Sequence, residues 1–208
     1  MISSEQVITN IKQKGMEWIN THILVCRHTT TKPGSISHLL YGEQPSEQSV
    51  NIKMGKFGEF IAKEMVLANP QLELLPCGVQ KINNRRKDVD LIFIDKLAKK
   101  IHYKELKGNI ELDTEKLPAT IEKCDEIKAY LKETYPEYTI DCGILNWSVY
   151  DRKILTSGIS NIRTFENAGV AIEHMSTFLD IVGLDWSEHD FYDYFREIGK
   201  RTKSFNNS

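Results

Sequence analysis

Two acidic residues and a lysine are spaced in a way that suits metal-dependent phosphate chemistry. Asp90 lies in the run 87–95 (KDVDLIFID), and Glu105 and Lys107 lie in the run 101–107 (IHYKELK). Both runs are rich in β-branched and aromatic residues, and the segment between them is short and polar. This pattern predicts two strands joined by a tight connection at 96–99.

With that loop, Asp95 opposes Lys100 and Asp90 faces Glu105 across the hairpin. Side chains alternate along a strand, so Glu105 and Lys107 share one face, about 7 Å apart. Two opposed carboxylates repel unless a positive charge lies between them. A divalent cation would remove the repulsion, since hard cations such as Mg²⁺ prefer oxygen ligands and keep waters that can attack a phosphate. Lys107 would place a donor beside that water or the phosphate.

An acidic residue, a short span and Glu-x-Lys on the next strand resemble the PD-(D/E)xK nuclease pattern, present here as Asp90 and Glu105-Leu106-Lys107. The run 105–116 (ELKGNIELDTEK) is similar to the active-site strand and following segment of type II restriction endonucleases. The resemblance covers about 50–175. It implies an α/β fold with a restriction-endonuclease-like core, in which helices flank a mixed central β-sheet. We expect one domain over 1–208, with a helical N-terminal part (1–70), a catalytic core (71–175) and C-terminal helices (176–208).

The resemblance also implies roles for the site residues. Asp90, Glu105 and the Leu106 carbonyl would hold Mg²⁺, and Lys107 would position or activate the attacking water. The segment 55–59 (GKFGE) is similar to the helix that gives many restriction endonucleases an extra active-site Glu. Glu59 is therefore expected to assist through a water or a second metal. Hydrolysis of double-stranded DNA in this family leaves 5′-phosphate and 3′-hydroxyl ends.

The sequence departs from the family pattern just before Asp90, where Val89 stands and Asp88 is a second acidic candidate. In the predicted register Asp88 opposes Lys107. We therefore expect Asp88 to form a salt bridge or to support the site.

A basic segment at 78–87 precedes the acidic pair. Asn and Arg side chains read adenine and guanine edges, whereas Lys pairs with phosphate. Its position beside the acidic pair favours DNA contact, although such a segment can equally be a charged hairpin turn. The residues expected to bind DNA are Lys81, Asn83, Asn84, Arg85 and Arg86. A palindromic target would imply a homodimer, with a nicking monomer or a heterodimeric half as alternatives.

Composition narrows the classes of protein. The chain has 208 residues, 40% of them hydrophobic and 27% charged, which is an ordinary globular balance. A formal net charge of −2 excludes a globally basic nucleic-acid binder, so DNA contact must come from local patches. The four cysteines are scattered and indicate neither a zinc site nor a disulfide framework. With no signal-peptide pattern and no apolar run of transmembrane length, we expect a cytoplasmic protein.

Helical and strand periodicities complete the predicted architecture. Further strands are expected at 138–149 and 169–173, and polar loops at 27–49 and around 151–153 and Arg163. Helices are expected at 4–22, 51–68, 118–134, 175–181 and 187–200.

Two other functions stay open. Repair nucleases and junction resolvases use the same fold and metal site, and cleavage of branched but not linear duplex would favour them. The other alternative is a non-catalytic DNA-binding or structural α/β domain, in which the three residues form a solvated charge cluster. Absence of divalent-metal binding would favour that alternative.

Overall fold

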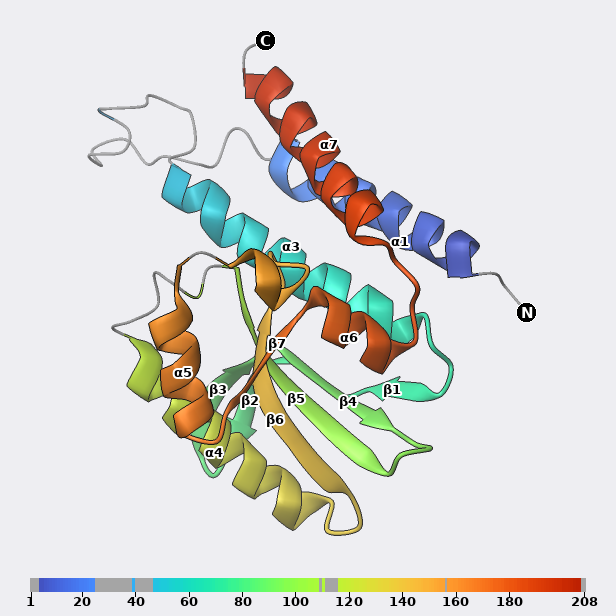
Figure 1. Cartoon of the computed structure of the whole chain (residues 1–208). Helices are drawn as coiled ribbons and strands as arrows, with labels where there is room; N and C mark the ends of the chain where they lie inside the picture. The colour runs from blue at the N-terminus through green and yellow to red at the C-terminus, as the bar shows by residue number, and fades with distance from the viewer. Residues whose placement is uncertain are drawn as a thin grey trace. The chain divides into compact units, whose positions relative to one another are not determined.

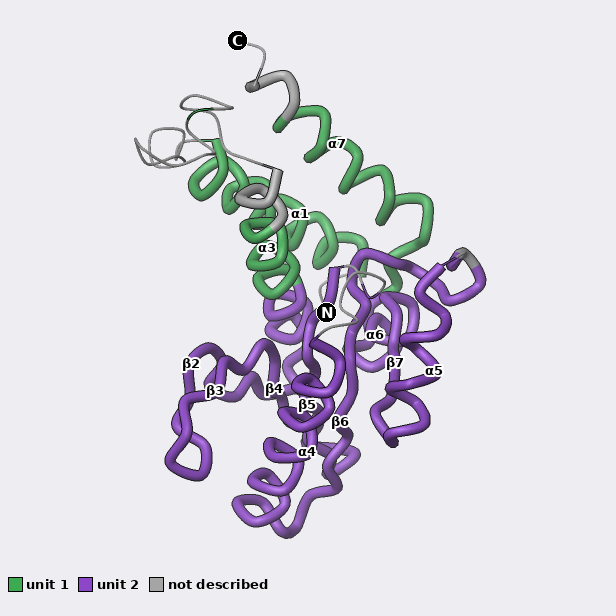
Figure 2. Tube along the Cα trace, turned by 90° about the vertical axis from the view of Figure 1, so that its left-hand side faces the viewer, with its two compact units in different colours: residues 1–61, 185–208 green, residues 62–184 purple. Residues whose placement is uncertain are grey.

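The computed structural model describes residues 4–24, 39, 47–108, 110, 116–155 and 157–206. The predicted loop at 27–49 therefore lies almost entirely outside the described residues. The chain forms two compact units, one from 1–61 with 185–208 and the other from 62–184 (Figure 2). The single-domain prediction stays a prediction, because a compact unit is not the same as an independently folding domain.

The unit 62–184 is built on a mixed five-stranded sheet (Figure 1). Its first three strands pair antiparallel and the last three pair parallel. The strand order is β1 (Leu72–Leu74), β4 (Leu91–Asp95), β5 (Lys100–Lys107), β6 (Thr139–Asn146) and β7 (Ala171–His174). Strand β5 is central, so its backbone is hydrogen-bonded to β4 on one side and to β6 on the other.

Helices pack on both faces of this sheet (Figure 1). Alternate side chains of β4 and β5, including Ile92 and Tyr103, join one buried cluster with residues of α4 (Leu117–Thr134) and α5 (Ile159–Asn167). On the opposite face, Phe93 meets Phe178 of α6 (Met175–Val182) edge-on, with ring centroids 6.3 Å apart. The predicted α/β class, with a mixed sheet between helices, is confirmed.

A separate two-stranded ribbon is formed by β2 (Gly78–Ile82) and β3 (Arg85–Val89). Ile82 and Val89 anchor the ribbon in the same cluster as α4. The ribbon lies beside β4 without joining its sheet (Figure 2).

The unit formed by 1–61 and 185–208 is helical. It contains α1 (Ser4–Ile19), the π-helical turn Asn20–Leu24, most of α3 (Glu47–Leu67) and α7 (Glu188–Asn206). Position 15 of α1 is a glycine, and the Tyr194 hydroxyl of α7 lies directly against it. A Cβ on residue 15 would overlap that hydroxyl, so a larger side chain would push Tyr194 away. The aromatic residues of α7 pack inside this unit, as the buried Phe191 and Tyr194 show.

Most element predictions are confirmed within a few residues. Ser187 directly precedes α7, and its hydroxyl accepts from the Asp190 N–H at 3.3 Å, which caps that helix. Two are wrong. Arg163 lies in helix α5 and not in a polar loop, and the run 87–95 is divided between two strands, β3 and β4, instead of forming one. Within the described ranges, no helix combines the length and the apolar composition needed to cross a membrane.

Candidate active site

The β4–β5 hairpin has the predicted register. Asp95 pairs with Lys100 and Leu91 with Lys104, so the next position places Asp90 opposite Glu105. The Asp95 carboxylate also shapes the turn, since its Oδ1 accepts from the N–H groups of Leu97 and Ala98 at 2.9 and 2.8 Å. A local side-chain turn therefore sets the register that brings the two acidic residues together.

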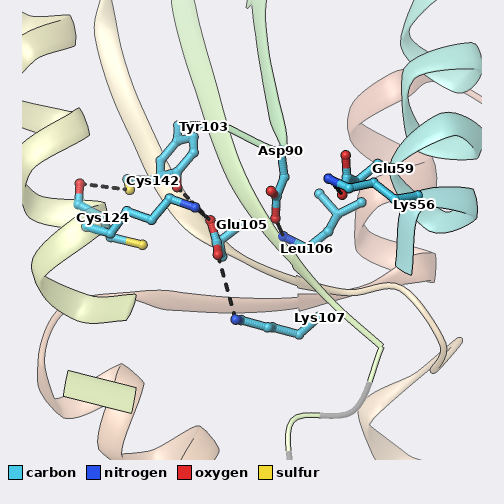
Figure 3. Close-up of polar contacts among 10 residues, drawn as sticks. Lys56, Glu59, Asp90, Tyr103, Glu105, Leu106, Lys107, Cys124 and Cys142 are labelled. Atoms are coloured by element: carbon cyan, nitrogen blue, oxygen red, sulfur yellow. Dashed lines mark hydrogen bonds and ion pairs between the residues drawn. The ribbon is translucent and has the colours of Figure 1, made fainter. Parts of the chain in front are cut away.

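Asp90 lies at the point where β3 ends and β4 begins. Its Oδ2 accepts a hydrogen bond from the Leu106 N–H at 2.8 Å. The chain re-enters the main sheet only after Asp90, so no backbone group of β4 lies opposite the Leu106 N–H. The Asp90 side chain supplies the missing hydrogen-bond partner. The contact fixes Asp90 to the strand segment that carries Glu105 and Lys107 (Figure 3).

The predicted position of Asp88 is wrong. Asp88 pairs with Val79 in the β2–β3 ribbon and does not oppose Lys107. The run 87–95 was expected to form one continuous strand, but the chain changes sheets at Asp90. Residues before that point therefore follow the ribbon's register.

Glu105 is a nearly buried carboxylate, with 9% of its side chain exposed. Its Oε2 accepts from the Tyr103 hydroxyl at 2.8 Å and from Lys123 Nζ of α4 at 2.5 Å. Its Oε1 lies 3.7 Å from Lys107 Nζ. Two ammonium groups and one hydroxyl thus surround a single carboxylate (Figure 3).

Lys107 and the residues after it are held by the end of β6. The Lys107 carbonyl accepts from the Trp147 N–H at 3.1 Å, and the Gly108 carbonyl accepts from the Ser148 hydroxyl. Two residues further on, the Ile110 carbonyl accepts from the buried Asn161 amide of α5 at 2.8 Å. The backbone that carries the lysine is therefore fixed by neighbouring elements.

The negative charges of Glu105 and Asp90 both affect the pKa of the Tyr103 phenol. Burial, followed by the charge of Glu105, raises the pKa of Tyr103 well above its ordinary value, and Asp90 adds to the effect. Tyr103 therefore stays protonated and donates to Glu105.

The donor set fits a hard divalent cation, since Asp90 and Glu105 present carboxylate oxygens from adjoining strands. The set is small. No group of three or more His, Cys, Asp or Glu side chains in the described part of the chain is placed to hold a metal ion. Two carboxylates and a backbone carbonyl nevertheless suit Mg²⁺, which usually keeps several waters.

Glu59 lies on α3 in the segment assigned to the helical unit. Its carboxylate pairs with Lys56 Nζ at 2.7 Å, one turn earlier on the same helix. Its predicted role at the metal site rests on the sequence resemblance.

The five residues predicted to bind DNA are gathered on the β2–β3 ribbon. Asn83 and Asn84 form its two-residue turn, with φ values of 49° and 62°, as a type I′ hairpin requires. The guanidinium of Arg85 lies 3.4 Å from Glu126 of α4, which also pairs with Lys87. Lys81 and Arg86 are cross-strand partners in the ribbon. The segment is a charged β-hairpin, and its contact with DNA stays a prediction.

Two partners of Glu105 were missed by sequence reasoning. Tyr103 lies two residues before Glu105 on β5 and so shares its strand face, but the sequence assigns it no role. Lys123 lies beside Thr120, Cys124 and Ile127, which form the buried face of α4. Its position next to the apolar face of a predicted helix was a sequence signal that Lys123 points toward the sheet. That signal does not identify Glu105 as its partner.

Comparison with known proteins adds no assignment. Neither protein-family models nor curated proteins match this sequence.

Proposed function

We propose that this protein is a Mg²⁺-dependent endonuclease with a restriction-endonuclease-like fold that hydrolyses double-stranded DNA at specific sites. The supporting observation is the placement of Asp90 opposite Glu105, with Lys107 two residues further along β5. A mixed sheet with helices on both faces agrees with that fold. The PD-(D/E)xK resemblance supplies the reaction, with 5′-phosphate ends as products.

Each residue has a distinct role in this proposal. Asp90, Glu105 and the Leu106 carbonyl would hold Mg²⁺, which when bound supplies an activated water and neutralises charge on the phosphate. The ammonium group of Lys107 donates a hydrogen bond to the attacking water or to a phosphate oxygen. Tyr103 orients Glu105 through its 2.8 Å hydrogen bond. Glu59 is kept as a predicted assisting residue on the basis of the sequence.

Site specificity is assigned to the β2–β3 ribbon. Its turn carries two amide side chains, and its strands carry Lys81, Arg85 and Arg86. Amides can read adenine edges while the cations contact phosphates or guanine. The ribbon joins the main sheet directly at Asp90, so DNA held by the ribbon would be linked through a short chain segment to the acidic pair.

The first test is cleavage of linear phage DNA by the purified protein with MgCl₂. Discrete fragments are expected, and EDTA should abolish them. Asp90→Asn, Glu105→Gln and Lys107→Met should each reduce cleavage by at least ~10²-fold, because each removes a ligand or donor needed in the transition state. Glu59→Gln should also reduce cleavage, because Glu59 is the predicted assisting residue.

The matched control is Asp88→Asn, which changes an acidic residue two positions away that pairs with Val79 in the ribbon. This variant should retain cleavage. Equal loss in Asp88→Asn and Asp90→Asn would contradict the assignment of Asp90. Uncut linear DNA with cleaved branched DNA would indicate a structure-specific nuclease, and failure to bind divalent metal would indicate a non-catalytic domain.

A further inference from the structure

The charges around Glu105 balance without a metal. Glu105 forms ion pairs with Lys107 and Lys123. Asp90, whose charge acts on the same Tyr103 phenol as Glu105, brings the count to two negative and two positive charges. Burial of Glu105 makes this balance important, since an uncompensated buried carboxylate is costly. A divalent cation added to a neutral cluster would leave an excess of two positive charges, and the withdrawal of one ammonium group would reduce that excess to one.

Lys123 is the ammonium group placed to withdraw. It is the closer of the two, with Nζ 2.5 Å from Glu105 Oε2, whereas Lys107 Nζ is 3.7 Å from Oε1. It reaches the carboxylate from α4 through four flexible methylene groups, and 18% of its side chain remains exposed. The Lys123 side chain can therefore turn toward solvent while the helix stays in place.

We propose that Lys123 is an internal cation that neutralises Glu105 in the metal-free protein and is displaced when a divalent cation binds. This inference rests on the proposed metal site. Lys123 lowers the affinity for Mg²⁺, because its ion pair with Glu105 Oε2 competes with a cation for that carboxylate and must break when the cation binds. It also stabilises the metal-free protein, in which Asp90 and Glu105 would otherwise repel each other.

The test measures Mg²⁺ binding by isothermal titration calorimetry and the melting temperature without metal, using the full-length protein and MgCl₂ alone. Lys123→Met should bind Mg²⁺ at least about fivefold more tightly and melt at a lower temperature in EDTA. Lys123→Arg keeps the charge and should bind with the affinity of the wild type. Lys132→Met changes an exposed lysine in the last turn of α4 and should alter neither quantity.

The outcomes separate this inference from the proposed function. Binding by the wild type with equal or weaker affinity in Lys123→Met would overturn the role of Lys123 and leave the metal site standing. No Mg²⁺ binding by either protein would overturn both. If Lys123→Met fails to fold, Lys123→Gln, which retains a hydrogen-bond donor without charge, should show the tighter binding, and an unchanged affinity there would overturn the inference.

Discussion

At the scale of single residues, the most unusual side chain outside the candidate site is Lys104, which is fully buried. Its Nζ donates to Asp141 at 2.8 Å and to Glu173 at 2.5 Å, and His102 Nδ1 lies 2.8 Å from the same Asp141 oxygen. Lys104 lies on β5 between Tyr103 and Glu105, so it points to the opposite face of the sheet. Adjacent residues of one strand thus serve two separate charge clusters.

Asp141 should make stability depend on pH. The hydrogen bond from His102, together with Lys104, lowers the pKa of Asp141 below its ordinary value. The unfolded chain therefore takes up this proton first as pH falls, so the stabilisation is present above about pH 4 and is lost at lower pH. Asp141→Asn should cost about 2 kcal/mol at pH 7, measured by urea unfolding.

The difference between the wild type and Asp141→Asn should shrink as the pH is lowered from 5 to 3. Asp125→Asn provides the control, since Asp125 is an exposed carboxylate on α4. A difference that stays constant across this range would contradict the assignment of the pH dependence to Asp141.

At the scale of elements, the decisive feature is the change of sheet at Asp90. Strand β3 pairs with β2, and β4 pairs with β1 and β5, although only Asp90 separates β3 from β4. The ribbon and the acidic pair are therefore connected by a single residue. This arrangement is the reason for the proposal that the ribbon reads DNA while the hairpin carries the chemistry.

The ribbon's turn allows backbone and side-chain effects to be separated. Replacing Asn83 and Asn84 together by glycine keeps the positive φ values at no steric cost but removes both amides. The double variant should keep its melting temperature and lose the discrete cleavage pattern, as judged by calorimetry and gel mapping of fragment ends. Replacement of both residues by alanine should also lower stability, by roughly 1 kcal/mol per residue.

Lys99→Gly is the matched control for that experiment. Lys99 also has a positive φ, 50°, but lies in the turn of the β4–β5 hairpin. Its substitution should leave the fragment pattern unchanged. A wild-type pattern from the Asn83→Gly/Asn84→Gly variant would remove these amides from the proposed recognition surface.

At the scale of the whole molecule, the proposed cleavage of a palindromic duplex favours a homodimer. One site of this kind cuts one strand, and two-fold symmetry places a second copy on the other strand. Size-exclusion chromatography with light scattering should give a mass twice the 24.0 kDa of one chain. The Glu105→Gln variant should bind a target duplex in a ratio of two chains to one duplex.

A 24.0 kDa species that cuts both strands would contradict the homodimer. A species of the same mass that produces only nicks would identify the monomeric alternative. Plasmid DNA distinguishes these products, because a nick gives open circles and a double-strand cut gives linear molecules.

Local patterns in the sequence determined the β4–β5 hairpin, its register and the position of α4. The reason is that side-chain alternation, a short polar loop with Asp95 before it, and Pro118 in the first turn of α4 act over a few residues. These features are enough to place Asp90 opposite Glu105 and Lys107 on the same strand face as Glu105. They also determined the α/β class.

Tertiary structure alone decided the partners that lie far apart in the chain. Asp88 follows the ribbon because β3 pairs with β2, and Lys123 meets Glu105 because α4 packs over β5. Lys104 meets Glu173, 69 residues away, because β5, β6 and β7 are neighbours. Periodicity reports which face of an element is buried, but it carries no information about which element covers that face.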